Sequence, residues 1–399
     1  MELPFPSFRD ARQHGIVQKW GKDYNGRGTF LAATGFGKTR TMILAAKKTL
    51  GSNQDRTCIV IVPTLYLKEQ WEMELLKHNV PNTKVYVINT AVTLTLKCSL
   101  LILDEIHLYN SKVFGNIFTT VKYTWVIGAT ATLDESKEFI LQRYAPVFER
   151  ISLEECLHNG WVSDFVIYNL GIELADEDKE TYETLTTKFN KHFSFFQHDL
   201  KIAMDCMNVE EFRSAYSIST GIPSKVLLIH AIQFMRVMRE RKEFIYEYAG
   251  KLAVVKELIA RFPERRIITF SQTINFADLI TSNLGDISIS YHSKIGAKLK
   301  REALRRFRDV NNKVRVINTA KSFDLGVDFP FVDMSVVLAS NSTTTQALQR
   351  VGRIIRAEDQ KRAIEVNIYI KDTQEERWVR RKQKESVNVY YVDSIEEIE

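Results

Sequence analysis

The sequence is poor in cysteine and has no long apolar run. Its four cysteines are dispersed along 399 residues without a C-x-x-C pair, so neither a disulfide framework nor a cysteine zinc site is indicated. No run of about 18 uncharged apolar residues occurs, and the N-terminal residues lack the apolar core of a signal peptide. These absences argue against secreted and membrane-spanning classes, and we expect a protein of the reducing cytoplasm with no membrane partner.

The overall composition is that of a globular protein. Hydrophobic residues make up 45% and charged residues 26% of the chain, as in ordinary globular domains. The chain is too long for one typical core, so we expect two domains with room for an insertion. The net charge of +6 is only a mild indication of a polyanionic partner, because it is spread over a large chain.

Short apolar runs alternate with longer amphipathic ones. Runs that are apolar on both faces are typical of parallel strands covered by helices, and they occupy residues 57–63, 84–89, 99–105 and 123–130. Residues 174–251 are rich in charge and aromatics and indicate helices. Strand patterns return at 265–272, 286–293, 313–320, 333–340 and 365–372. We predict an α/β fold of two parallel-sheet domains in tandem: a first domain at 1–150, a linker and helical insertion at 151–250, and a second domain at 251–399.

A glycine-rich turn lies between an apolar run and a helical one. Residues 32–39, AATGFGKT, match the spacing of a phosphate-binding loop, with Ala32 in place of its first glycine. In such a loop the backbone N–H groups surround the phosphates, Lys38 neutralises the β and γ oxygens, and the Thr39 hydroxyl is a Mg²⁺ ligand. The residues predicted to bind ATP here are Thr34, Gly35, Phe36, Gly37, Lys38, Thr39 and Arg40.

Two carboxylates end the apolar run at 99–105, in the segment LLILDEIHLYN. The carboxyl edge of a parallel sheet is where phosphates bind in open α/β folds. Such a pair can also be merely solvated. Beside a phosphate-binding loop it predicts ATP hydrolysis, with Asp104 holding Mg²⁺, Glu105 orienting or deprotonating the attacking water, and His107 coupling this site to the other domain.

A third motif, QALQRVGRIIR, occupies residues 346–356. Arg350, Arg353 and Arg356 repeat at a spacing that places them on one face of a turn or helix. Guanidinium groups brought to a γ-phosphate stabilise transition-state charge. Taken without the other motifs, the segment can also be interpreted as a solvated basic face of a helix.

Together the motifs occur in a characteristic order: ATGFGKT, DEIH, GATAT at 128–132, NTAKSFDLGVDFP at 318–330, and QRVGRIIR. In this order the chain resembles the superfamily 2 helicases and translocases of the DExH type. The resemblance implies two RecA-like domains that bind ATP and Mg²⁺ in the cleft between them. It also implies hydrolysis that requires domain closure and moves a nucleic-acid strand.

The resemblance assigns further residues. FRDARQ is similar to the adenine-reading motif, with Gln13 as the base contact, although Arg12 stands where the family has an aromatic residue. Gly326 and Asp328 fall in a motif that faces nucleotide and nucleic acid, together with Asn318. Gln349, Arg353 and Arg356 face the ATP across the cleft.

The nucleic-acid contacts are also assigned by resemblance. VPTLYLKEQW resembles the strand-gripping motif through Pro63, Thr64, Gln70 and Trp71, and Thr130 and Thr132 belong to the segment that links hydrolysis to strand movement. The predicted nucleic-acid-binding residues are Pro63, Thr64, Thr90, Thr130, Ser271, Gln272 and Thr319.

The segment at 151–185 bears on the choice between DNA and RNA. It resembles the link between the two motor domains in XPB-like, phage UvsW-like and restriction-enzyme translocases. Those proteins act on duplex or branched DNA. The alternative interpretation is that the segment is only a helical spacer. We therefore expect an ATP-dependent DNA helicase or translocase that remodels duplex, forked or branched DNA, in a bacterium or a phage-infected cell. The alternatives are an RNA helicase and a non-hydrolysing, ATP-gated nucleic-acid clamp.

Two basic segments each allow two interpretations. Residues 294–315 hold nine lysines and arginines against two acids. The segment predicts an amphipathic helix, with Leu299, Leu304 and Phe307 on its apolar stripe. The basic face of this helix is either solvated or follows the phosphates of a nucleic acid. Residues 225–251 pack a helical core, or else contact duplex backbone. The candidate contacts in that second reading are Arg236, Arg239, Arg241 and Lys242.

Overall fold

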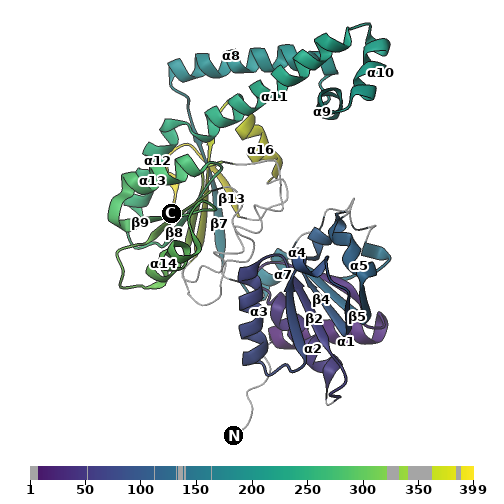
Figure 1. The fold of residues 1–399 in the computed structure, drawn as a ribbon. Helices are drawn as coiled ribbons and strands as arrows, with labels where there is room; N and C mark the ends of the chain where they lie inside the picture. Colours follow the sequence, from purple (N-terminus) through teal and green to yellow (C-terminus); the bar gives the residue numbers. More distant parts are fainter. Residues whose placement is uncertain are drawn as a thin grey trace.

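Two parallel sheets and a helical arm make up the structure, a computed structural model (Figure 1). It describes residues 8–51, 53–111, 113–131, 133, 138, 141–162, 164–320, 332–339, 362–382 and 388–399. The predicted α/β fold of two parallel-sheet domains with helices is confirmed. In the described part of the chain, no helix has both the length and the apolar character needed to cross a membrane.

The first sheet has six strands in the order β3-β2-β4-β5-β1-β6, and every pairing in it is parallel. Its central strands are buried on both faces, which explains their continuous apolar sequences. The strands are β1 (Arg27–Ala32), β2 (Cys58–Val62), β3 (Thr83–Val87), β4 (Leu96–Asp104), β5 (Val121–Thr130) and β6 (Val147–Ile151). The helices around it are α1 (Phe8–Asp23), α2 (Lys38–Leu50), α3 (Leu65–Lys77), α4 (Ile88–Ala91), α5 (Ile117–Thr120) and α7 (Leu153–His158).

The second sheet has seven strands in the order β13-β7-β12-β11-β8-β10-β9. They are β7 (Phe165–Ile172), β8 (Ile267–Ser271), β9 (Ser288–Tyr291), β10 (Val316–Ala320), β11 (Met334–Val337), β12 (Ala363–Ile370) and β13 (Val389–Val392). Helices α12 (Ala249–Arg261), α13 (Ile274–Leu284), α14 (Ala297–Arg308) and α16 (Gln374–Lys382) belong to this lobe.

Strand β7 was not predicted from the sequence, which assigned residues 151–250 to a linker and insertion. It lies between β12 and β13 in the second sheet. Polar and small residues interrupt its apolar pattern, among them the fully buried Asn169, whose side-chain oxygen accepts a 3.2 Å hydrogen bond from Asn367 Nδ2. The chain thus passes from the first sheet to the second before the arm begins. The domain limits at 150 and 250 stay a prediction.

The helical arm projects away from both sheets (Figure 1). It consists of α8 (Asp176–Phe193), α9 (Leu200–Asn208), α10 (Glu210–Thr220) and α11 (Ser224–Tyr246), as the helical pattern predicts. Its own small core includes Phe196, Cys206, Leu227 and Phe234. The arm therefore has packing of its own beyond the lobe that carries it.

Two of the four cations proposed to contact the DNA backbone form interactions within the arm. The Arg241 guanidinium is buried, donates to Tyr182 Oη at 3.1 Å and lies over the Phe189 ring. Arg236 forms a 2.7 Å ion pair with Glu240. The helical-core reading is therefore correct for Arg241, because its charge is held inside the arm.

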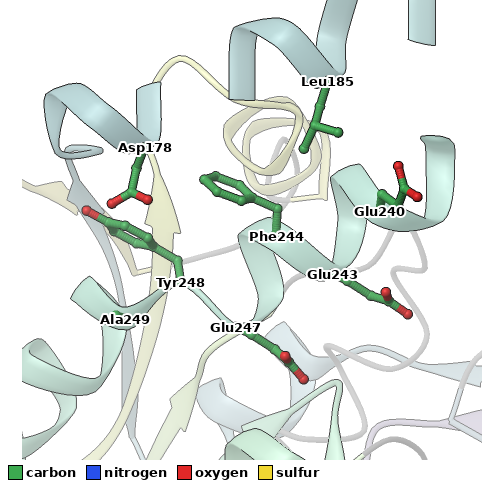
Figure 2. Close-up of a pocket in the computed structure, with 8 residues that line it drawn as sticks. All are labelled: Asp178, Leu185, Glu240, Glu243, Phe244, Glu247, Tyr248 and Ala249. Atoms are coloured by element: carbon green, nitrogen blue, oxygen red, sulfur yellow. The ribbon is translucent and has the colours of Figure 1, made fainter. Parts of the chain in front are cut away.

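The base of the arm is acidic on one side. A pocket of about 430 Å³ lies between α8 and α11, and Asp178, Glu240, Glu243 and Glu247 are among the residues that line it with Phe244. Figure 2 shows Asp178 on one side of Phe244 and the three glutamates on the other. Because carboxylates repel phosphates, this pocket itself is unfavourable for a nucleic-acid backbone.

The basic helix α14 is amphipathic, as predicted. Leu304 and Phe307 are buried, but Leu299 is exposed and does not join the apolar stripe. At the end of α14, the Arg308 guanidinium donates to Tyr66 Oη at 3.2 Å, and Tyr66 lies on α3 of the first lobe. The two lobes are thus in contact beside the start of α3.

Candidate active site

The glycine-rich turn connects β1 to α2, as the sequence predicts. Gly35 and Gly37 have φ angles of 91° and 98°, which residues with a Cβ rarely adopt. A Cβ on Gly37 would lie 2.6 Å from Gln13 Nε2, so glycine also permits a close approach of α1. Lys38 begins α2, and its Nζ donates to Ala32 O at 3.2 Å across the turn. The N–H groups of the first helical turn therefore face the loop.

Asp104 ends β4, the strand between β2 and β5. Its carboxylate is buried and accepts hydrogen bonds from Trp71 Nε1 at 2.8 Å and from the Glu105 backbone N–H at 3.0 Å. Burial, and next the charge of Glu105, raise the pKa of Asp104 to about 6, although Trp71 and Lys38 act in the opposite direction. A nearby cation would therefore be favourable, because it offsets the cost of a buried charge.

Glu105, Thr130 and His107 form a triangle at the edge of the first sheet. The Thr130 hydroxyl donates to Glu105 Oε2 at 3.1 Å and lies 2.8 Å from His107 Nδ1. His107 Nδ1 is 3.3 Å from the same carboxylate oxygen. Burial would raise the pKa of Glu105, but His107, Lys38 and Thr130 together lower it below its usual value. Glu105 is therefore held as a carboxylate by its neighbours.

The backbone of Glu105 is unusual as well. Its φ of 50° and ψ of 53° place a residue with a Cβ in the left-handed region. Such a conformation costs about 1 kcal/mol or more and persists where the surroundings fix it. Here the conformation turns the chain out of β4 and brings the Glu105 carboxylate to Thr130, which ends β5. The unfavourable backbone conformation of Glu105 therefore places its carboxylate at Thr130.

The predicted adenine contact, Gln13, lies beside the loop. Its side chain is 1% exposed, and Nε2 donates to Phe36 O at 2.9 Å. Among the described residues, the buried Oε1 atom has no hydrogen-bond partner, which costs free energy unless a donor is supplied. Arg12, at the position where the family has an aromatic residue, forms 3.0 Å ion pairs with Glu149 and Glu155 instead. Arg12 is therefore a structural residue of the first lobe.

Arg9 is a site residue that the sequence analysis missed. Its Nε donates to Phe36 O at 2.9 Å, Nη1 donates to Trp161 O at 3.3 Å, and Nη2 donates to Gly35 O. The sequence holds one indication of this role. Arg9 lies one helical turn before Gln13 on α1, and this spacing places both side chains on the same face of the helix. The structure thus adds a guanidinium beside the loop.

The predicted strand-gripping residues separate into two groups. Pro63 and Thr64 lie between β2 and α3, where Thr64 Oγ1 caps the helix by accepting from Leu67 N at 3.3 Å. Trp71 is 1% exposed and contacts Asp104. In the structure the Trp71 indole lies in the interior against Asp104 and not at the surface, and the match of this segment to a strand-gripping motif stays a prediction.

The other predicted nucleic-acid contacts differ in exposure. Thr90 is exposed on α4 and Gln272 is partly buried after β8. The Thr319 hydroxyl donates to Thr269 O at 2.7 Å, and Ser271 Oγ donates to Thr319 O at 3.0 Å, both in buried positions. Their roles in binding a strand stay predictions. Asn318 is fully buried, and its amide is bonded to Thr269, Thr281 and Ser288.

Several predicted site residues lie outside the described residues. They are Thr132, Gly326, Asp328, Gln349, Arg350, Arg353 and Arg356. The described part of the site therefore belongs to the first lobe, where the lysine turn, the acid pair and Gln13 come together.

Comparison with protein families matches both lobes. Residues 8–95 match the family model described as the res subunit of type III restriction enzymes, and residues 250–358 match the helicase conserved C-terminal domain. The chain is 26% identical over 407 residues to the DNA 3'-5' translocase XPB2 of Sulfurisphaera tokodaii, covering 96% of this chain and 87% of that protein. It is 24% identical over 302 residues to the XPB helicase/translocase subunit of general transcription and DNA repair factor IIH from Danio rerio, covering 73% of this chain and 32% of that subunit.

Solved structures share the fold. The crystal structure of the Pyrococcus furiosus Hef helicase domain matches with a TM-score of 0.58 at 14% identity, covering 93% of this chain and 97% of that one. Dbp5 of S. cerevisiae bound to RNA and ADP BeF3 matches with a TM-score of 0.56 at 13% identity, covering 92% of this chain and 85% of that one. The tandem RecA-like architecture is thereby confirmed.

Proposed function

Since this chain is an ATP-dependent helicase or translocase of superfamily 2, in its XPB-like branch, we propose that it moves along duplex, forked or branched DNA and remodels it. In this proposal each cycle of ATP hydrolysis closes and reopens the cleft between the two lobes. Closure alters the grip on the nucleic acid, and the chemical step is thereby converted into movement. The protein would do this in the cytoplasm.

One observation carries the proposal: the lysine turn and the acid pair lie together at the carboxyl edge of the first sheet. Lys38 acts electrostatically on both Asp104 and Glu105. Glu105 is tied to Thr130 at the end of the neighbouring strand. A cation beside the phosphates and a carboxylate that orients the water are parts that phosphoryl transfer to water uses, and the hydrogen bond from Thr130 holds that carboxylate in place.

We propose ATP as the nucleotide and Mg²⁺ as the metal. The buried, unpartnered Gln13 Oε1 suits a donor such as the adenine amino group. Asp104 and the Thr39 hydroxyl supply oxygen ligands, which Mg²⁺ prefers. When bound, the ion would neutralise phosphate charge. The residues of this chain would position the nucleotide through Lys38 and the loop backbone, and orient the attacking water through Glu105.

The second lobe would complete the site. We propose that Gln349, Arg353 and Arg356 face the ATP from that lobe and that Gly326 and Asp328 contribute to the same surface. The guanidinium groups would stabilise transition-state charge. Neither lobe would then hydrolyse ATP efficiently alone, and nucleic acid that favours closure would stimulate turnover.

DNA is the proposed track. The Sulfurisphaera relative is described as a DNA translocase, and this chain covers most of that protein's length. The strand-gripping part would begin at Pro63 and Thr64, at the N-terminus of α3, where the positive end of the helix dipole attracts a phosphate. Contacts to phosphates would make binding strongly dependent on salt.

The test is nucleic-acid-stimulated ATP hydrolysis at a stated salt concentration. Rates are compared with duplex DNA, forked DNA, single-stranded DNA and RNA, for the wild type and for Glu105→Gln and Lys38→Ala. We expect DNA to stimulate the wild type, Glu105→Gln to bind ATP with little turnover, and Lys38→Ala to lose both. Stimulation by RNA alone would support an RNA helicase, and absence of turnover in the wild type would support a clamp. Either result overturns the proposal.

A further inference from the structure

We infer that Trp161 couples the phosphate-binding loop to the second sheet. It acts as a positioning residue and does not touch the reacting atoms. This inference rests on the proposed function, because it concerns how nucleotide binding in one lobe reaches the other. Three observations carry it: the linker is fixed to the first lobe, Trp161 contacts the loop, and the chain continues from Trp161 into β7.

The linker between the sheets is not a free tether. Ser152 Oγ caps α7 by accepting from Glu155 N at 2.9 Å, and the Glu155 carboxylate pairs with Arg12 of α1 at 3.0 Å. Cys156 is fully buried, and its carbonyl accepts from Trp161 N at 2.9 Å. Gly160 supplies the positive φ of 64° that turns the chain at this point. These contacts fix the position of Trp161 relative to the first lobe.

Trp161 contacts the phosphate-binding loop in two ways. Its ring meets the Phe36 ring edge-on, with centroids 5.5 Å apart. Its carbonyl accepts from Arg9 Nη1 at 3.3 Å, and the same guanidinium binds the carbonyls of Gly35 and Phe36. The loop backbone, the loop side chain and the linker backbone therefore share one small assembly of Arg9, Phe36 and Trp161.

From Trp161 the chain enters the second sheet. Phe165 begins β7, which pairs in parallel with β12 and with β13. Phe165 and Ile167 belong to the same apolar cluster as Phe36 and Trp161. Trp161 is therefore packed in one apolar cluster with the first residues of a strand that lies inside the second sheet.

Phosphate binding should displace this assembly. The loop binds phosphates through backbone N–H groups, and rotating a peptide plane to present its N–H also swings its carbonyl. The carbonyls of residues 35 and 36 are the ones that Arg9 holds. Phe36 is fully buried, and Trp161 is 5% exposed, so the ring cannot move without moving its neighbour in a close-packed interior. In this inference the loop takes one arrangement without nucleotide and another with it, and such a two-state element is what coupling needs.

The first experiment uses the tryptophan itself as the reporter. Intrinsic fluorescence of the full chain is recorded while Mg²⁺ and ADP are titrated in, for the wild type, Trp161→Phe and Trp125→Phe. Trp125 lies on β5 against Gly26 and Arg56, away from the loop, and serves as the control. We expect the nucleotide-dependent change to be much smaller in Trp161→Phe, where Trp71 beside Asp104 still responds, and to be undiminished in Trp125→Phe. A change in Trp161→Phe that is as large as in the wild type overturns the inference.

The second experiment separates coupling from folding and from the proposed function. DNA-stimulated kcat and the KM for ATP are measured for the wild type, Trp161→Ala and Trp161→Phe. We expect Trp161→Ala to reduce DNA stimulation about tenfold with a smaller change in KM, and Trp161→Phe to restore part of it. If the wild type is not stimulated by DNA, the proposed function fails. If the wild type is stimulated and Trp161→Ala is stimulated equally, only the coupling role fails.

Discussion

The indole Nε1 of Trp71 donates a 2.8 Å hydrogen bond to Oδ2 of Asp104. Trp71 lies on α3, the helix that Thr64 caps beside the proposed strand-gripping residues. One short helix thus connects the proposed nucleic-acid contact at its start with the proposed Mg²⁺ carboxylate on its inner face. A movement of α3 imposed by DNA would reach Asp104 directly.

Replacing Trp71 by phenylalanine should weaken the metal site. Phenylalanine retains most of the apolar packing but leaves Asp104 Oδ2 without its indole donor. Trp71 is one of the groups that lower the pKa of Asp104, so without it Asp104 holds a proton more readily and the Mg²⁺ concentration for half-maximal ATP hydrolysis should rise severalfold. Trp20→Phe is the matched control, because the buried Trp20 indole donates to the Val126 carbonyl, away from the acids. Equal Mg²⁺ dependence in the two variants would contradict this assignment.

Thr130→Val should slow ATP hydrolysis more than it weakens ATP binding. The valine keeps the shape of the side chain but removes the hydroxyl that holds Glu105 and meets His107. We expect kcat to fall about tenfold, and Thr130→Ser to stay near the wild type because it retains the hydroxyl. Thr29→Val provides the control, since Thr29 is equally buried and donates to Ala145 O in the turn before β6. Similar losses in both valine variants would indicate general destabilisation.

Glu149 should make the stability of the first lobe depend on pH. Burial would raise the pKa of this carboxylate, but hydrogen bonds and charges from Lys19 and Arg12 lower it below 4.5. The native state therefore binds this proton less readily than the unfolded state does. The resulting stabilisation is present above the unfolded pKa and is lost as the pH falls through the folded one.

The measurement is the free energy of unfolding of the wild type and Glu149→Gln between pH 7 and pH 4. At pH 7 we expect the variant to be less stable by about 1 kcal/mol, and the difference should shrink at the acidic end. Glu154→Gln is the control, because Glu154 is exposed on the adjacent helix α7. A difference that stays constant with pH would show that packing and not charge causes it.

Lys251 should be essential for the second lobe. Its Nζ is fully buried and bonds both carboxylate oxygens of Glu375, at 2.9 and 2.8 Å, and Leu338 O at 2.6 Å. Lys251→Met leaves a buried carboxylate without its cation and should reduce the free energy of unfolding by about 3 kcal/mol or more. Lys256→Met, at an exposed position of the same helix, should have little effect. Adding Glu375→Leu should recover only part of the loss, because Ile370 N and Leu338 O then lack partners.

The elements that the sequence predicted well are those whose signals are local. The glycine turn, α2 and the carboxylates after β4 depend on residues that are close in the chain. Strand β7 escaped prediction because its burial depends on β12 and β13, which come much later. The alternative of Arg241 as a surface cation stayed open for the same reason: its partner Tyr182 is 59 positions away.

The sequence by itself determined which chemical groups are present and in what order: a phosphate-binding turn, an acid pair and two sets of parallel strands. Short-range sterics and apolar periodicity suffice for these. Only the tertiary structure decided which groups meet. Trp71 turns inward to Asp104 across 33 positions, and Arg9 reaches Trp161 across 152. Such pairings follow from the packing of whole helices against a sheet, which no local pattern specifies.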